Sequence, residues 1–400
     1  MQQKPVPFFL FTILMMVTFQ SAAQEDRIQY PPVLKNSYFG VNIGHINYAF
    51  SARQLNPGNT VEAIRVPHAA VRIILFGHEF NKNLSAQISY MRPVKWVEYR
   101  NVNGNGLTHT VWMNVAGLTV AGKLPLGKKI SIFGEAGLGL IMRKGFEADN
   151  EIAVPHASYA TGLFGSSLRF HPNKRWDLQL TSAWSPAHAR DRQPATLFIG
   201  AGFNYYMRAL PAARVEEVKK AGYHFPKQMI YAGFSTNVAG YKVNTTVSQG
   251  AIPIFWGGEA RVKRGFLVNY QRNIFHSRKV FSLDWGAGIG IWKSRENKQS
   301  FVTLSAYPLF RFTALRSKTA DFYFEYSVAG PTWISKTMID NEDTGRNFTF
   351  QDMMGIGVFA GKKKNLNAGI RIAHYSNGNL FPANNGVMVP LTFNLGHTFN

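Results

Sequence analysis

The 400-residue sequence contains no cysteine, and its 22 acidic residues are half as many as its 44 lysines and arginines. Without cysteine, disulfide bonds and thiolate metal sites are excluded. The histidines are scattered with no metal-ligand spacing, and neither a glycine-rich phosphate loop nor a dinucleotide fingerprint is present. We therefore expect neither a bound metal nor a cofactor.

The shortage of acids leaves a formal net charge of +22, which favours an anionic partner. Nucleic acid is one candidate, but the sequence has no nucleic-acid recognition motif and no basic helix. Aromatic residues make up 14% of the chain and fall mostly on alternating positions. A membrane surface that carries phosphates is the better partner, and we expect no nucleic acid.

Long apolar runs are also scarce. After residue 23 no stretch approaches eighteen consecutive apolar residues, which argues against a transmembrane helix. The N-terminus has Lys4, a mostly apolar run over residues 6–19 and the small residues Ser21–Ala22–Ala23. This pattern predicts a signal peptide over residues 1–23 and an exported mature protein.

The sequence is rich in two-residue periodicity. Trp176, Leu178 and Leu180, for example, alternate with Asp177 and Gln179. The predicted strands are long, with polar or glycine-rich opposite faces, and a tilted membrane strand needs about 9–11 residues. The pattern predicts an all-β fold, a transmembrane antiparallel β-barrel. A soluble secreted sandwich is the second interpretation.

The predicted strands form two series. The first covers residues 37–49, 67–79, 84–93, 109–122, 128–142, 157–170, 176–185 and 196–208. The second covers residues 229–241, 252–260, 264–274, 279–293, 301–313, 320–331, 347–360, 365–377 and 387–399. The second series has nine candidates, whereas a bacterial barrel needs an even number, so we expect one strand fewer within 252–274.

Between the two series lies a polar, basic interruption that reads as a linker. We predict two tandem eight-stranded barrels, and one barrel of about sixteen strands is the alternative. The predicted domains are an N-terminal outer-membrane barrel over 24–208, a linker over 209–227 and a C-terminal barrel over 228–400. In the last strand, plain alternation places Val389 and Leu391 on the outer, apolar face.

The candidate site lies in the strand predicted over 365–377. Ile370 and Ile372 belong to an apolar stripe that continues into His374 and Ser376, because residues two apart share a strand face. A histidine base and a serine nucleophile at this spacing are the minimum for activating a hydroxyl. Asn377 and Gly378 follow directly, and we expect them to supply hydrogen-bond donors to an oxyanion.

The run His-Tyr-Ser-Asn-Gly-Asn-Leu-Phe-Pro-Ala-Asn-Asn-Gly, which begins at His374, resembles the signature of the lipid A 3-O-deacylase family, often grouped as acyloxyacyl hydrolase-like. The resemblance implies an eight-stranded outer-membrane barrel that removes an ester-linked acyl chain from lipid A. It implies that His374 is the base, Ser376 the nucleophile and Asn377 an oxyanion donor. The specific match covers about twenty residues, with looser similarity over 229–400; the first half resembles only generic outer-membrane barrels.

One position departs from that signature. The family has a glutamate two positions after the turn glycine, where this sequence has Met388, and a methionine cannot orient an imidazole. A tight hairpin around Lys362 and Lys363 would pair residues whose numbers sum to about 724–726. Asp352 would then lie opposite Ile372 or His374, and we expect it to replace the glutamate. The alternative is that a bulge turns Asp352 into the barrel interior.

The first functional hypothesis is an esterase of the cell outer membrane that deacylates lipid A with Ser376, His374 and Asp352. The expected partners are lipid A or lipopolysaccharide and outer-membrane lipid, with basic loop residues on the lipid A phosphates. A second copy of the chain is also a candidate partner. The second hypothesis is a non-catalytic barrel with a degenerate hydrolase site, which Met388 supports. A diffusion pore ranks third, because side chains fill small barrels.

Overall fold

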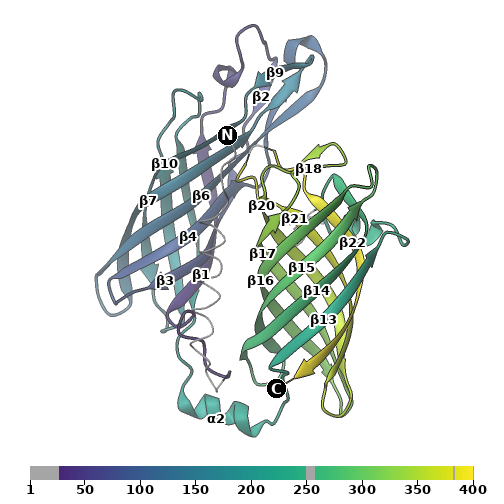
Figure 1. The fold of residues 1–400 in the computed structure, drawn as a ribbon. Coiled ribbons are helices and arrows are strands. Elements are labelled where there is room, and N and C mark those ends of the chain that lie inside the picture. Colours follow the sequence, from purple (N-terminus) through teal and green to yellow (C-terminus); the bar gives the residue numbers. More distant parts are fainter. Residues whose placement is uncertain (1–26, 249–256, 382, 400) are drawn as a thin grey trace, which may run out of the picture.

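The computed structural model describes residues 27–248, 257–381 and 383–399. The predicted signal peptide, residues 1–23, lies outside the described residues. The chain forms two closed antiparallel β-barrels joined by a short helix, α2 (Ala212–Lys220) (Figure 1). Two tandem eight-stranded barrels are thus confirmed, and the alternative of one larger barrel is wrong. Among the described residues, no helix has the length and hydropathy to cross a membrane.

Each strand of the first barrel pairs with its neighbours in chain order, and the sheet closes through the pairing of β1 with β12. Its eight wall strands are β1 (Ser37–Tyr48), β3 (Ala69–Glu79), β4 (Leu84–Pro93), β6 (Thr108–Pro125), β7 (Ile130–Lys144), β10 (Ala157–Phe170), β11 (Trp176–Ser185) and β12 (Thr196–Tyr206). Around this wall lie β2 (Ala63–Arg65), β5 (Val97–Arg100), β8 (Phe146–Ala148), β9 (Glu151–Val154) and two 3-10 turns, η1 (Ala52–Gln54) and η2 (Val102–Gly104).

The second barrel closes through the pairing of β13 with β22. Its wall strands are β13 (Gln228–Thr236), β14 (Ala260–His276), β15 (Phe281–Ser294), β16 (Ser300–Arg316), β17 (Ala320–Ile334), β20 (Phe348–Ala360), β21 (Leu366–Ser376) and β22 (Val387–Phe399). Two elements lie in connections between wall strands. Helix α3 (Lys242–Ser248) follows β13, and the hairpin of β18 (Met338–Ile339) and β19 (Glu342–Asp343) follows β17. One strand, β14, occupies the described part of 252–274, and residues 252–256 lie outside the described residues. The domain limits given above stay predictions.

The alternating residues sort between the two faces of the wall as expected. In β11, Trp176, Leu178 and Leu180 are exposed, whereas Asp177 and Gln179 are buried in the barrel. An apolar exterior and a polar interior are what a barrel in a bilayer requires, since lipid surrounds it and its backbone is satisfied by closure.

Charged side chains are paired inside the second barrel. Glu325 on β17 forms buried ion pairs with Arg371 on β21 and Arg311 on β16. Arg311 also contacts Asp284, and Arg371 donates to the Tyr231 hydroxyl. Nearer the loop end, apolar and aromatic side chains fill the interior. The interior positions of both sheets are therefore filled by side chains, as in other small barrels.

The two ends of each barrel differ. Short turns lie at the end that α2 joins, and the long connections lie at the other, which we call the loop end (Figure 1). In outer-membrane barrels the longer loops face outside. The β18–β19 hairpin is fixed at this end by Asp340, whose carboxylate accepts hydrogen bonds from the backbone N–H groups of Arg295, Glu296 and Asn297 at 3.0, 3.1 and 2.8 Å.

We predict that Glu325→Ala destabilises the second barrel strongly. The substitution leaves Arg371 as a buried charge without its carboxylate, and breaking a buried ion pair costs about 3–5 kcal/mol. The unfolding temperature in detergent micelles, followed by circular dichroism, should fall. Glu216→Ala on the exposed face of α2 is the matched control, and equal unfolding temperatures for the two variants would contradict the prediction.

A second prediction concerns Asp340. Partial burial would raise the pKa of its carboxyl group, but the hydrogen bonds from Ser294 and from the backbone N–H groups of 295–297 outweigh burial and lower it. A carboxyl group whose pKa is lowered by folding stabilises the fold above its ordinary pKa of 3.8 and loses that contribution as pH falls through the lowered value.

The turn at 295–297 should therefore stay protected from hydrogen exchange at neutral pH and open in acid below the lowered pKa. Asp340→Asn should open it at neutral pH as well. Glu296→Gln is the control, because it also replaces a carboxylate by an amide in the same turn, but at an exposed side chain. Unchanged exchange of the 295–297 amides in Asp340→Asn would refute the role of this carboxylate.

Candidate active site

The candidate site is built on three adjacent strands at the loop end of the second barrel. His374 on β21 is directly paired with Asp352 on β20 and with Met388 on β22. Direct cross-strand partners share one face of a sheet and have Cβ atoms about 5 Å apart. The three side chains therefore form one row, with the histidine in the middle.

Asp352 is held between the histidine and a bulge in β17. Its Oδ2 lies 3.7 Å from His374 Nδ1, and its Oδ1 accepts a hydrogen bond of 2.7 Å from the Ala329 backbone N–H. Ala329 lies at the register shift between Ser327 and Gly330, with φ of 55°. A non-glycine residue in this left-handed region is strained, and such strain gathers at functional positions. The bulge thus orients the carboxylate toward the imidazole.

His374 is covered although its strand position belongs to the outward-facing row. Leu366 and Ile370 of that row are exposed, but His374 is 2% exposed. Gly386 lies against the ring, so closely that a Cβ there would come within 2.8 Å of His374 Nε2. The segment before β14 lies against Gly386 in turn, with a 2.7 Å hydrogen bond from Glu259 N–H to the Asn385 carbonyl. The loop thus covers the imidazole.

Ser376 is half-buried at the end of β21. Its Oγ–H donates a hydrogen bond of 3.0 Å to Asn384 Oδ1, and its Oγ accepts one of 3.3 Å from the Gly378 N–H. Asn384 Oδ1 also accepts the Asn377 backbone N–H at 2.8 Å. The β21–β22 loop therefore fixes the hydroxyl through its own residues.

The Asn377 side chain is buried and binds loop carbonyls. Its Nδ2 donates to the Thr344 carbonyl at 3.1 Å and to the Ala383 carbonyl at 2.6 Å. Asn385 makes a further link to the β18–β19 hairpin, because its Nδ2 donates to Glu342 Oε2 at 2.6 Å. The hairpin that Asp340 anchors is therefore part of the framework of the site.

The predicted face of Val389 is wrong. Between the pairs Arg371–Thr392 and Ala373–Val389, β22 carries one residue more than β21. This bulge turns Val389 into the barrel interior, whereas Leu391 remains outside it, half-buried. The same shift brings Met388 onto the face of His374, where plain alternation would have placed it inside the barrel.

Sequence reasoning assigned no role to Asn384, Gly386 or Ala329. Asn384 and Gly386 belong to the quoted signature, so the signature could have indicated that they are part of the site. Ala329 had none, because a bulge inside an alternating strand leaves little trace in an apolar sequence. Among the described residues, no group of three or more His, Asp or Glu side chains gathers as a metal site would.

A hollow of about 470 Å³ lies at the opposite end of the molecule, at the short turns of the first barrel. Its walls include Lys123, Lys128, Lys174 and the paired Arg208 and Glu79. It contains none of the predicted site residues, so the candidate site is not in this hollow.

Comparisons with known proteins separate the two barrels. Residues 258–397 match the family model described as lipid A 3-O-deacylase (PagL), and the first barrel lies outside that match. A search of curated proteins finds no match. Among solved structures, the outer membrane enzyme PagL is similar at 16% identity and a TM-score of 0.32, over 42% of this chain and 97% of that one.

Two other solved barrels give weaker likenesses. The N-terminal barrel of Pseudomonas aeruginosa OprF is 13% identical, with a TM-score of 0.28, over 43% of this chain and 98% of that one. Yersinia pestis Ail is 13% identical, with a TM-score of 0.27, over 43% of this chain and 99% of that one. The strand pairing described above, not these likenesses, defines the fold. The protein is thus an outer-membrane protein of two eight-stranded barrels, and its second barrel matches the lipid A 3-O-deacylase (PagL) family.

Proposed function

We propose that the second barrel is an esterase that removes an ester-linked acyl chain from lipid A. The observation that carries the proposal is the row of Asp352, His374 and Met388, with Ser376 two residues after His374 on the same strand, within the residues that match the family model. An acid, an imidazole and a serine hydroxyl are the groups that activate a serine nucleophile.

The roles follow from the contacts. Asp352 faces Nδ1 of His374, at a distance of 3.7 Å that is longer than a hydrogen bond and still within ion-pair range. A carboxylate on that side keeps the proton on Nδ1 and stabilises the imidazolium that forms later. Nε2 then acts as the base toward the Ser376 hydroxyl, which must rotate away from Asn384 to reach it.

The proposed reaction uses only these side chains and water, with no cofactor. Ser376 Oγ attacks the acyl carbonyl carbon while His374 takes its proton. The tetrahedral intermediate collapses, the bond to the sugar oxygen breaks, and His374 returns the proton to that oxygen. Water then attacks the acyl carbon of the acyl-enzyme while His374 takes a proton from it. The bond between that carbon and Ser376 Oγ breaks, His374 returns the proton to Oγ, and the fatty acid leaves.

Of the two expected oxyanion donors, Gly378 is the better placed. Its N–H already points at Ser376 Oγ, at 3.3 Å. Asn377 uses its Nδ2 to hold the Thr344 and Ala383 carbonyls, so it would have to release one of them to act as a donor. We propose that the Gly378 N–H donates a hydrogen bond to the oxyanion and that Asn377 holds the loop in its conformation. The candidate homodimer stays a prediction.

We predict that envelopes with the wild-type protein contain lipid A that has lost one acyl chain, and that Ser376→Ala abolishes this loss. Loss of the nucleophile should lower kcat by at least about 10³-fold. Mass spectrometry of lipid A is the measurement. Ser300→Ala, at an exposed position at the loop end of β16, is the control. Unchanged lipid A with correctly inserted wild-type protein would favour a non-catalytic barrel.

A further prediction tests the acid. Asp352→Asn keeps the shape but favours the wrong tautomer of His374, so kcat should fall by about 10³–10⁴-fold. Met388 lies across from His374 on the other side, so Asp352→Asn combined with Met388→Glu returns a carboxylate to the row. We expect the double variant to recover a large part of the lost activity, as measured by acyl-chain release.

The matched control is Asp352→Asn with Met388→Gln, which adds the same bulk without charge. Recovery by Gln as well as Glu would mean that packing, and not the carboxylate, decides the rate. Full activity of Asp352→Asn alone would remove Asp352 from the mechanism.

A further inference from the structure

A corner of the first barrel is buried although it lies in the outward-facing rows. On β6, Leu118 is 56% exposed, but Asn114, nearer the loop end on the same face, is 1% exposed. On the adjacent strand β7, Leu138 is 64% exposed, and Met142, the partner of Asn114, is 3% exposed. Something other than lipid covers this corner.

The cover is the β21–β22 loop, which directly follows the candidate nucleophile. Asn379 and Phe381 line one small hollow together with Asn114 and Met142 of the first barrel. The Ser158 hydroxyl on β10 donates a hydrogen bond of 3.4 Å to the carbonyl of Leu380. The first barrel therefore supports the β21–β22 loop, and the seam between the barrels begins at the candidate site.

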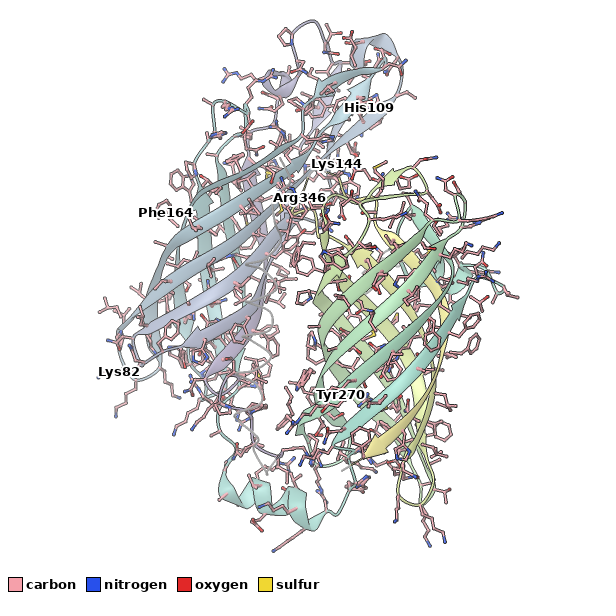
Figure 2. The ribbon with its side chains drawn as sticks, viewed as in Figure 1. Lys82, His109, Lys144, Phe164, Tyr270 and Arg346 are labelled. Carbon is pink, nitrogen blue, oxygen red and sulfur yellow. The ribbon has the colours of Figure 1, made fainter. Side chains whose placement is uncertain are left out.

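Two cations from different barrels lie near Phe381, where the barrels meet. Lys144, half-buried at the end of β7, lines the same hollow as Phe381, and its Nζ lies 5.4 Å from the centre of the Trp112 ring. Arg346, from the loop after β19, has its guanidinium carbon 5.1 Å from the centre of the Phe381 ring. Figure 2 shows both at the junction of the barrels. Within the described residues, neither forms an ion pair with a carboxylate.

Arg346 lies close in the chain to a residue that contacts the candidate site. It lies two residues after Thr344, whose carbonyl accepts a hydrogen bond from Asn377, next to Ser376. A molecule held by Arg346 would thus lie beside the loop that directly follows the nucleophile. Both cations are at the loop end, where the headgroups of outer-leaflet lipids lie if the long loops face outside.

We propose that the first barrel is a substrate-recognition element and that Lys144, together with Arg346, binds a phosphate of the lipid A headgroup. The inference rests on the proposed function, because it assigns the substrate of the same site. Phosphate suits this pair, since arginine offers a planar fork of donors and lysine a compact charge. The lipid would lie in the seam, with its headgroup held by both barrels and its ester directed toward Ser376.

The test compares lipid A that carries its phosphates with chemically dephosphorylated lipid A, using the full-length protein. Lys144→Gln should raise KM for the phosphorylated lipid about tenfold, the size expected for one lost hydrogen bond to a charged group. It should leave KM for the dephosphorylated lipid unchanged. Arg346→Gln should behave in the same way, and Lys144→Arg should keep the wild-type KM. Lys82→Gln, in a turn of the first barrel far from the seam, is the control (Figure 2).

An equal change of KM for both lipids, or no change for either, would overturn the inference and leave the esterase proposal intact. If the wild type releases no acyl chain, binding of the two lipids to the wild type and to Lys144→Gln replaces the kinetic readout. A loss of binding confined to the phosphorylated lipid would support recognition by the first barrel without catalysis. Equal binding of the two lipids, unchanged in Lys144→Gln, would overturn the inference.

Discussion

The closure of each β-sheet is the constraint on which the rest of this structure depends. In a bilayer core no water satisfies backbone N–H and C=O groups, so a sheet must have no free edge. The pleat of each strand points successive side chains to opposite faces, and closure turns one face to the lipid and the other to the interior, so apolar side chains sort outward and polar ones inward. The buried network of Glu325, Arg371 and Arg311 follows from that sorting, because charges inside a narrow barrel must pair with one another.

The candidate site lies where the regular wall is interrupted. A bulge in β17 places Ala329 so that its N–H holds Asp352, and a bulge in β22 turns Met388 toward His374. Both bulges lie toward the loop end, where strands leave the bilayer and the cost of irregular backbone is lower. Bulges commonly redirect side chains beside active sites, and here they do so from both neighbours of the central strand.

That Asp352 lies opposite Ile372 or His374 could be predicted from the sequence, because the hairpin of β20 and β21 is tight and its pairing is regular, and the structure shows that His374 is the partner. The face of Val389 could not, since a single extra residue in β22 reverses the alternation without changing composition. The burial of His374 was also beyond sequence reasoning. It depends on Gly386 and on the segment before β14, which are brought together only by the closed barrel. No sequence pattern near the contacting residues indicates that the two barrels touch each other.

The position of His374 on the middle strand of three explains how a methionine at the expected glutamate position is compatible with a working site. A residue on a central strand has two direct cross-strand neighbours on its own face, one on each side. A carboxylate on either neighbour can lie beside the imidazole, provided that the strand carries the right register. In this chain β22 offers Met388 and β20 offers Asp352, so the acid has a place on the opposite side of the same row. The proposal of a working site therefore rests on this buried carboxylate, which the Ala329 N–H holds on the His374 side of the row.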